Sequence, residues 1–284
     1  MAGDRDAPSR ATLEHYESSA EQFWQGTRDH DVSQNIESLL EALEGEGPFS
    51  ILDFGCGPGR DLMAIKARGH RPTGLDGSAS FVRMAREHAD VPVLHQNFLA
   101  LDLPADRFDG IFANASLFHV PKAELPRVLR ELGRCLRPRG VLFSSNPRGN
   151  NEEGWSRGRF GAYHDFDAWS GFVTGAGFEP IRHYYRPDGL PRDQQPWLAS
   201  LWRRAESRGV TDGAIDPKFI SGTRHRLSAP ETRRWWPWTR PVEGVQARRL
   251  RLTVWSPFAP ASAARMAKPT GPRAGTPADP GTRA

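Results

Sequence analysis

The stretch FSILDFGCGPGRD, which runs from Phe49 to Asp61, decides how this chain folds. Its first half is a short, mostly apolar run, typical of a buried strand in a parallel sheet. Gly55, Gly57 and Gly59 follow at alternate positions, and glycine permits both a sharp turn and a close approach of the backbone to a ligand. A helical pattern then continues to Gly69. We therefore expect a strand, a turn and a helix, with free N–H groups at the turn that suit an anionic ligand group.

Outside this stretch, short apolar runs alternate with helical patterns. Further strands are expected at His70–Leu75, Val91–His95, Phe108–Ala113, Val141–Ser145, Phe178–Tyr185 and Trp197–Trp202. Helices are expected at Ala11–Trp24, from Asp31 or Ser33 to Leu43, and at Ser78–Ala89, Pro121–Leu136 and Phe166–Thr174. Such alternation predicts a doubly wound, mostly parallel α/β sheet of seven strands, with an antiparallel connection between the last two.

The connections between these elements matter because doubly wound sheets bind ligands beyond the carboxyl ends of their strands. The glycine turn, Asp76, Asn97 and Asn114 each follow a predicted strand, so we expect them on one rim of the sheet. The segment Asn146–Tyr163 is rich in glycine and polar residues and is expected to be a long loop on the same rim. Pro138–Gly140 is expected to be a turn.

Composition divides the 284 residues into three parts. Residues 1–10 and the Pro/Gly/Arg-rich tail 205–284 are expected to be disordered, and residues 11–204 to form one domain. The tail holds 14 Lys/Arg and 6 Asp/Glu, which leaves 24 and 28 for the rest, so the high pI belongs to the tail. This distribution argues against nucleic acid as the partner of the domain. The RRWWPWTR cluster, Arg233–Arg240, is either part of the disordered tail or a patch for a membrane or nucleic acid.

Cysteine and histidine usage bears on the compartment and on metal binding. The two cysteines, Cys56 and Cys135, suggest no disulfide framework and suit a reducing cytosol. The N-terminus lacks the apolar segment of a signal peptide, and no apolar run approaches the length of a membrane span. The nine histidines have no metal-ligand spacing, so no metal is expected. We therefore expect a cytoplasmic protein without a membrane partner, and the sequence leaves its oligomeric state open.

A series of motifs resembles the class I S-adenosylmethionine-dependent methyltransferases. ILDFGCGPGRD is followed in order by TGLDGS, HQNFLALDL, FDGIFANASLFHVP and LRPRGVLFSSNPRG, and the resemblance covers about Ala11 to Arg204. It implies a Rossmann-like methyltransferase fold, S-adenosyl-L-methionine as cofactor, and methyl transfer to an acceptor. A small-molecule acceptor is favoured because no added substrate domain appears. The alternative is a protein that binds the cofactor without catalysis, as a partner or regulator.

A dinucleotide-binding fold is the main alternative for the glycine turn. Its fingerprint is G-x-G-x-x-G, in which the third glycine packs the helix on the strand. In this chain Arg60 stands at that sixth position and the third glycine comes one place early, at Gly59. The segment FDGIFANASLFHV has no role in such folds, so we do not adopt this interpretation.

The resemblance also assigns parts of the cofactor to parts of the rim. Asp53 helps to hold the amino end of the methionine moiety, and Asp76 accepts hydrogen bonds from the ribose hydroxyls. Asn97 accepts from the adenine amine, and Phe98 packs on the adenine ring. Asp76 could instead be only a neighbour of a helix cap, and Asn97 only a loop cap. The full expected set is Trp24, Arg28, Asp53, Gly55, Cys56, Gly57, Gly59, Asp76, Gly77, Ser78, Asn97, Phe98, Asn114, Ala115 and Leu117.

The acceptor side is less specified. His119 and His164 are the candidates for a general base, which is needed only if the acceptor is protonated at neutral pH. Arginines and aromatic residues near the rim suggest an acceptor with a carboxylate. The expected substrate-binding residues are Arg148, Tyr163, Tyr185 and Arg186. The N-terminal helices are expected to form a lid over the cofactor, although their apolar face is equally explained by ordinary packing.

Overall fold

The computed structural model describes residues 6–206 of the chain. The helices are α1 (Ala7–Ser18), α2 (Ala20–Thr27), α3 (Ser33–Ala42), α4 (Arg60–Ala67), α5 (Ala79–Ala89), α6 (Leu125–Cys135) and α7 (Phe166–Gly175), with the 3₁₀ turns η1 (Leu117–His119) and η2 (Arg192–Gln194). The strands are β1 (Ser50–Phe54), β2 (Arg71–Asp76), β3 (Val93–His95), β4 (Phe108–Asn114), β5 (Leu136–Pro147), β6 (Glu152–Ser156), β7 (Arg159–Tyr163), β8 (Phe178–Arg186) and β9 (Trp197–Arg204). The predicted tail, with its Arg233–Arg240 cluster, lies outside the described residues apart from its first two.

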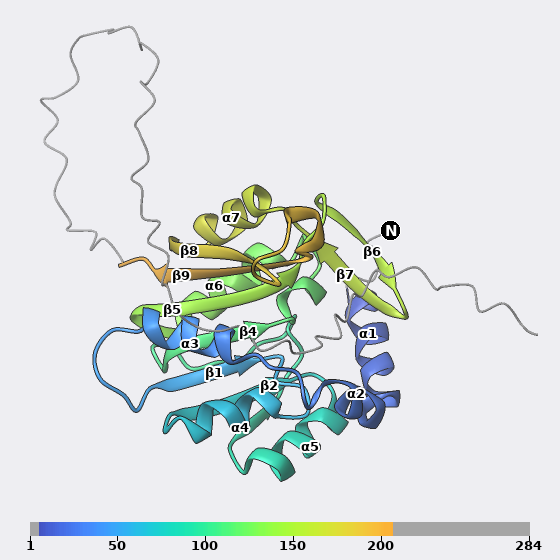
Figure 1. The fold of residues 1–284 in the computed structure, drawn as a ribbon. Coiled ribbons are helices and arrows are strands. Elements are labelled where there is room, and N and C mark those ends of the chain that lie inside the picture. Colours follow the sequence, from blue (N-terminus) through green and yellow to red (C-terminus); the bar gives the residue numbers. More distant parts are fainter. Residues whose placement is uncertain (1–5, 207–284) are drawn as a thin grey trace, which may run out of the picture. The chain divides into compact units, whose positions relative to one another are not determined.

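Seven strands form one sheet in the order β3-β2-β1-β4-β5-β9-β8 (Figure 1). The strands β1 to β5 are parallel, and β9 pairs antiparallel with both β5 and β8. The predicted mostly parallel sheet is therefore confirmed. We call the side where β1 to β5 end the carboxyl edge. Arg186 also reaches this edge, because it pairs with Trp197, which pairs in turn with Pro147.

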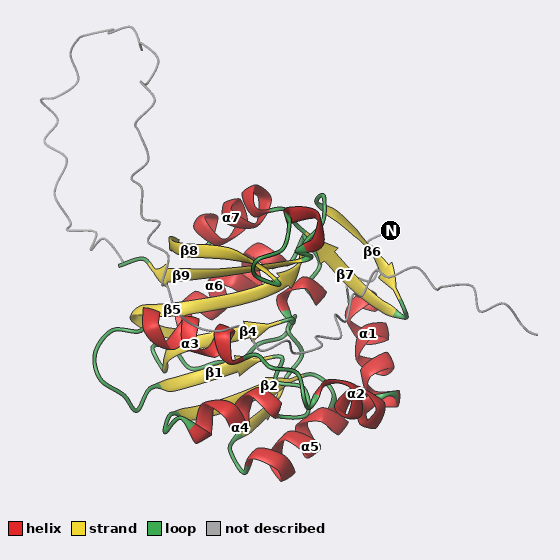
Figure 2. Ribbon diagram, viewed as in Figure 1, coloured by secondary structure: helices red, strands yellow, loops and turns green. Residues whose placement is uncertain are grey.

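Helices cover both faces of the sheet, because side chains along each strand alternate between the faces. On one face, Ile51 packs with Ile36 of α3 and Ile65 of α4, and α5 packs beside α4. On the other face, Leu52 packs in the cluster that contains the apolar residues of α6 and α7, such as Leu129. These two cores fix the sheet, and thereby the residues that follow each strand at the carboxyl edge (Figure 2).

The N-terminal helix differs from the prediction in two ways. It begins at Ala7 rather than Ala11, so the prediction of disorder is wrong for residues 7–10. Pro8 in the first turn explains the early start, since proline is well accommodated there. The predicted single helix is also divided at Ser19, whose Oγ donates to the carbonyl oxygen of His15 at 2.7 Å. Such a side-chain bond competes with the regular helical pattern.

Two boundaries around α6 also differ. The helix begins at Leu125 rather than Pro121, because residues 121–124 form a turn that precedes it. Pro138–Gly140 is not a turn but part of β5, which begins at Leu136. The register of the β4–β5 pairing shifts between Phe108 and Gly110 of β4, so Pro138–Gly140 form an irregular stretch within β5.

The predicted loop Asn146–Tyr163 is wrong in its main part. Residues 152–163 form a hairpin of β6 and β7, which pair antiparallel as a separate two-stranded sheet. Its two-residue turn consists of Arg157 (φ 52°) and Gly158 (φ 78°), the left-handed backbone that tight hairpins require. The apolar residues Trp155 and Phe160 on either side were the signal for this hairpin. β7 packs against α1 at the carboxyl edge (Figure 1).

Candidate active site

The glycine turn follows β1 and is packed tightly against its own chain. All three glycines have positive φ, and a Cβ on Gly55 would clash with Ser116. A Cβ on Gly59 would lie 2.9 Å from the Cα of Ala85 in α5. Glycine is therefore required here by the packing of the turn, independently of any ligand.

The prediction of free N–H groups at the turn is wrong for four of them. Gly55 and Cys56 donate to the carbonyl oxygen of Leu75 at 2.8 and 3.0 Å, and Gly59 donates to that of Cys56. The N–H of Gly57 donates to Asp76 Oδ2 at 3.0 Å. The side chain of Cys56 packs in the core below the turn, and burial raises the pKa of its thiol well above the usual range.

Two polar groups beside the turn are buried and unpaired. Asp53, at 1% exposure, has no hydrogen-bond partner for Oδ2 among residues 6–206, and the Oγ of Ser116 likewise has none. Burial raises the pKa of Asp53 well above its usual range, and the nearby carboxylate of Asp61 adds to this. Buried polar atoms without partners are costly, so this place favours a ligand that donates hydrogen bonds. A positively charged donor would also lower the pKa of Asp53.

Asp76 ends β2 and ties the turn to the next helix. Its Oδ2 accepts from Gly57, and its Oδ1 accepts from the N–H of Ser78 at 2.9 Å. Ser78 in turn caps α5, as predicted, by accepting from the N–H of Phe81. Burial raises the pKa of Asp76 to about 6. The N–H of Gly77 also bonds to this carboxylate, and because a carboxylate has about four acceptor positions, at least one remains for a ligand hydroxyl.

α1 lies across the carboxyl edge above β2 and β3. The side chain of Leu13 contacts Gly77, where an added Cβ would lie 2.6 Å from Leu13 Cδ2. Glu17 accepts from Ser78 Oγ at 2.6 Å and from both the N–H and the Oγ of Ser80. A groove of about 540 Å³ runs between them, lined by residues that include Leu13, Glu17, Gly77 and Ser78. The N-terminal helix thus covers the predicted ribose end, where a lid was expected.

Asn97 and Phe98 lie beyond β3 at the same edge. Oδ1 of Asn97 accepts from the N–H of Leu99 at 2.9 Å and from Ser9 Oγ of α1 at 3.1 Å. Asn97 therefore acts as a loop cap and a contact for α1. The ring of Phe98 stacks on that of Phe54, with centroids 4.2 Å apart.

The two predicted cofactor residues of the second helix point elsewhere. Trp24 stacks on His88 of α5 at 4.4 Å, and Arg28 is exposed beside Asp29. The aromatic ring that faces the turn is that of Phe23, which lies 3.7 Å from where a Cβ on Gly57 would be. Phe23 was expected in the lid together with Trp24, but only Trp24 was assigned to the cofactor, because adjacent residues of a helix face directions about 100° apart and the pattern did not fix the rotation.

Asn114 ends β4 in a network of side chains. Its Oδ1 accepts from Asn35 of α3 at 3.0 Å, and its Nδ2 donates to Asp61 at 3.1 Å. Asp61 also accepts from the Nε and Nη2 of Arg60, whose Nη1 donates to the carbonyl oxygen of Thr27. Arg60 was not predicted as a site residue. The guanidinium of this half-buried arginine is fully engaged with the chain.

The residues after Asn114 turn away from the edge. Ala115 has φ 62°, an uncommon backbone for a residue with a side chain. Leu117, a member of the expected cofactor set, is buried in the core with α6, so its side chain does not face the expected cofactor site. Phe118 remains beside the edge, and its ring centroid lies 6.1 Å from that of Tyr163.

His119 is held on both sides by other elements. Nδ1 lies 2.6 Å from the carbonyl oxygen of Phe160, and Nε2 lies 2.8 Å from the hydroxyl of Tyr16 in α1. Because a carbonyl oxygen only accepts, Nδ1 carries the proton and Nε2 accepts from Tyr16. Burial lowers the pKa of His119 to about 4, so the imidazole is neutral at neutral pH. His119 is thus unprotonated at Nε2, as a general base must be, and the Tyr16 hydroxyl occupies that nitrogen.

His164, the other predicted base, lies in a different environment. It is buried beside Trp169 and Phe172 of α7, and neither ring nitrogen has a partner in the described part of the chain. Burial lowers its pKa. The structure gives no contact between His164 and His119.

The four predicted substrate residues come together only in part, at Arg148 and Tyr185. Tyr185 lies under two guanidinium groups, those of Arg192 and Arg148, and packs on the α6 and α7 face. Arg186 follows it on β8 and therefore faces the opposite side. Tyr163 lies beside η1. Tyr185 and Arg186 are adjacent in the sequence, but successive side chains of a strand point to opposite faces of the sheet, so these two residues do not share a pocket.

Two features of the described residues bear on metal binding and on membrane insertion. Across residues 6–206, no group of three or more His, Cys, Asp or Glu side chains is arranged to hold a metal ion. None of the helices in this range has the length and apolar character needed to cross a membrane.

Comparisons with known proteins agree with the fold. A family model described as a methyltransferase domain matches residues 51–140, from β1 into β5. The most similar solved structures include 1,6-didemethyltoxoflavin-N1-methyltransferase of Burkholderia thailandensis, with a TM-score of 0.59 and 20% identity over 72% of this chain and 92% of that one. At this identity the likeness concerns the fold alone.

Two relatives by sequence are trans-aconitate 2-methyltransferases. That of Azoarcus sp. (strain BH72) is 37% identical over 116 residues, which are 40% of this chain and 45% of the relative, so the match spans less than half of that protein. That of Delftia acidovorans is 31% identical over 187 residues, which are 61% of this chain and 68% of the relative. With its ordered motifs and its seven-stranded sheet, this chain belongs to the class I S-adenosylmethionine-dependent methyltransferases.

Proposed function

We propose that this chain transfers a methyl group from S-adenosyl-L-methionine to a small-molecule acceptor that carries a carboxylate. The observation that carries the cofactor part is the pair of buried, unpaired acceptors beside the glycine turn, Asp53 Oδ2 and Ser116 Oγ. They suit the ammonium group of a methionine moiety, which is a charged donor. Family membership independently favours the same cofactor.

Each end of the cofactor has candidate residues around the carboxyl edge. Asp53 would hold the amino end, with the backbone of the Gly55–Gly59 turn beside the methionine moiety. Asp76 would accept from the ribose hydroxyls with the acceptor capacity that its backbone hydrogen bonds leave. Asn97 and Phe98 would border the adenine, although Asn97 Oδ1 already accepts two hydrogen bonds within the chain. α1 would exclude water above the ribose.

The chemistry asks little of the protein beyond positioning. When bound, the cofactor supplies a methyl group on a sulfonium, and the acceptor oxygen bonds to carbon as the carbon–sulfur bond breaks and its electron pair stays on sulfur. Holding the acceptor in line contributes roughly 7–11 kcal/mol in favourable cases. A carboxylate acceptor carries no proton at neutral pH, so it needs no base. A hydroxyl acceptor would instead give its proton to the Tyr16 hydroxyl, as that hydroxyl gives its own proton to the unprotonated Nε2 of His119.

The acceptor class rests on chemistry and on relatives. Relatives include two trans-aconitate 2-methyltransferases, whose acceptor is by name a polycarboxylate. The acceptor side of this chain also contains arginines without carboxylate partners in the described range, including Arg148, Arg159 and Arg192. Guanidinium groups recognise carboxylates through paired hydrogen bonds.

The proposal extends to the compartment. Cys56 and Cys135 are both buried as free thiols, which supports a reducing cytoplasm as the place of action. A small molecule is proposed as the only substrate, without nucleic acid or membrane.

The test is an acceptor screen with the purified full chain. The protein is incubated with S-adenosyl-L-methionine and small di- and tricarboxylic acids, trans-aconitate included, and S-adenosylhomocysteine is quantified. We expect turnover with at least one polycarboxylate and none with its fully esterified form. Tight cofactor binding by calorimetry without turnover of any acceptor would favour the alternative, a cofactor-binding protein without catalysis.

A further inference from the structure

Arg159, the first residue of β7, is a half-buried cation without an anion. Its Nη1 donates to the hydroxyl of Tyr16 at 3.2 Å, and its guanidinium lies over the Tyr16 ring at 5.5 Å. Its Nε is buried and has no hydrogen-bond partner within residues 6–206. Over the same range, no carboxylate lies within ion-pair distance of Arg159. Burial removes water from the guanidinium group, and no carboxylate of the described chain compensates for this loss. The arrangement is unfavourable unless a ligand supplies a negative charge.

The groups around Arg159 do not compensate its charge. Its field reaches His15, Tyr16, His119 and Tyr163, all of which are uncharged in their deprotonated or phenolic forms. Burial is the largest cause of the lowered pKa of His15 and His119, and the positive charge of Arg159 lowers both further. The carboxylates of Asp76 and Glu152 act on Tyr16 and Tyr163 from a distance, but within residues 6–206 neither forms an ion pair with Arg159.

Arg60 provides the comparison within the same chain. It is also largely covered, but its Nε and Nη2 donate to the two carboxylate oxygens of Asp61 at 2.6 and 3.0 Å. Its Nη1 donates to the Thr27 carbonyl at 3.0 Å. Arg60 is thus paired with a carboxylate of the protein, whereas the Nε of Arg159 is buried without a partner among residues 6–206.

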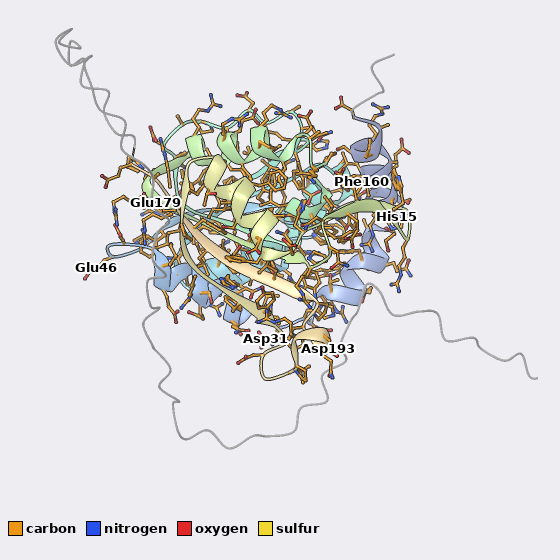
Figure 3. The ribbon with its side chains drawn as sticks, turned by 90° about the horizontal axis from the view of Figure 1, so that it is seen from above. His15, Asp31, Glu46, Phe160, Glu179 and Asp193 are labelled. Atoms are coloured by element: carbon orange, nitrogen blue, oxygen red, sulfur yellow. The ribbon has the colours of Figure 1, made fainter. Side chains whose placement is uncertain are left out.

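The position of Arg159 connects it to the site. Tyr16 joins it to His119, which closes the segment that follows β4, and Phe160, the next residue of β7, accepts from His119 Nδ1. Ser116, whose unpaired Oγ borders the glycine turn, lies three residues before His119. Figure 3 shows Phe160 beside His15 of α1, at the end of the molecule where β7 and α1 meet. Arg159 therefore lies on the acceptor side of the edge.

We propose that Arg159 binds a carboxylate of the methyl acceptor through its Nε and Nη2, with Tyr16 beside the bound group. This rests on the proposed function, and it sharpens the substrate class. An oxygen held in a guanidinium fork is a poorer nucleophile, because the ion pair stabilises its negative charge. Arg159 therefore holds a carboxylate that is not methylated, and the acceptor carries at least one further nucleophilic group. A polyacid is the simplest such molecule.

The test compares binding of a charged probe and its neutral form in full-length protein saturated with S-adenosylhomocysteine. The probes are trans-aconitate and its trimethyl ester, measured by calorimetry. We expect Arg159→Gln to weaken trans-aconitate binding about 10- to 100-fold, as expected for loss of charge-assisted hydrogen bonds. Arg159→Lys should recover part of this, since lysine keeps the charge without the fork. Ester binding should be equally weak in all variants.

Arg157→Gln is the matched control, because Arg157 is an exposed arginine in the turn of the same hairpin. It should bind trans-aconitate like the wild type, and S-adenosylhomocysteine affinity should agree within about twofold across the series. Equal trans-aconitate affinity in Arg159→Gln and wild type overturns the proposal, as does wild-type protein that binds the acid no better than the ester. If binding depends on Arg159 but no acceptor is methylated, the proposed function fails while this assignment holds.

Discussion

The carboxyl edge has two halves that differ in how their charges are satisfied. The proposed cofactor half, formed by the glycine turn and the ends of β2 and β3, pairs Arg60 with Asp61 and leaves Asp53 Oδ2 without a partner among residues 6–206. The acceptor half, formed by η1 and β7, contains Arg159 with no carboxylate partner among the described residues. The cofactor half thus lacks a hydrogen-bond donor for Asp53, and the acceptor half is not balanced without an anion.

α1 is the element common to both halves. Glu17 joins it to the start of α5 in the cofactor half, and Tyr16 joins it to His119 in the acceptor half. Substitutions on α1 can therefore be chosen to disturb one half of the edge at a time.

The largest effect is expected from Asp76→Ala in the cofactor half. Loss of a carboxylate that accepts from the ribose hydroxyls should weaken S-adenosylhomocysteine binding at least about 100-fold, since each charge-assisted hydrogen bond contributes about 1.5–3 kcal/mol. Calorimetry measures the affinity, and thermal unfolding checks that the variant is folded. Asp102→Ala, on the exposed loop beyond β3, is the control and should bind normally.

The pKa of Asp76 adds a pH dependence to this prediction. Because burial raises it to about 6, the carboxyl gains a proton as the pH falls through 6, and wild-type affinity for S-adenosylhomocysteine should fall with it. Asp76→Ala should lack this dependence. Unchanged affinity in the variant at pH 7 would contradict the assignment of Asp76 to the ribose.

A smaller effect on stability is expected from Gly59→Ala. The alanine Cβ would lie 2.9 Å from the Cα of Ala85, and φ is +97°, so the free energy of unfolding should fall by about 2 kcal/mol. Gly69→Ala is the matched control, because its φ of +83° carries the same backbone strain but nothing lies within 4 Å. If both variants lose equal stability in denaturant unfolding, tight packing of the turn does not explain Gly59.

The smallest effect is expected from Glu17→Gln on α1. Hydrogen bonds from Ser78 and Ser80 lower the pKa of Glu17 to about 2, but the side chain is exposed, so the expected loss is below about 1 kcal/mol. A lowered folded-state pKa stabilises above the unfolded value, near 4.5, and this contribution disappears as the pH falls toward 2.

The difference in melting temperature between wild type and Glu17→Gln should therefore shrink from pH 7 to pH 3. Glu14→Gln, an exposed neighbour on the same helix, should match the wild type throughout. A difference that does not depend on pH would mean that the carboxylate of Glu17 is not what holds α1 on α5.

Much of the cofactor half could be predicted because its information is local. The apolar run before Gly55, the position of Asp76 after β2 and the cap at Ser78 each depend on neighbours close in sequence. Parallel pairing then brings the strand ends to one edge. The errors concern rotation and register. The prediction assigned Trp24 rather than Phe23 to the cofactor and placed the side chain of Leu117 at the site rather than in the core. It also placed Tyr185 and Arg186 in one pocket, although they face opposite sides of the sheet.

The sequence by itself determined the sheet, the glycine turn and the family, since strand pattern and turn chemistry follow from short stretches. Only the tertiary structure decided the acceptor half. Arg159 and Tyr16 are separated by 143 positions, and His119 follows Tyr16 by 103. Their contact requires a hairpin where a loop was expected, with its strand β7 packed against α1. Side-chain pairs so distant in sequence have no local pattern, because their meeting is set by how whole elements pack.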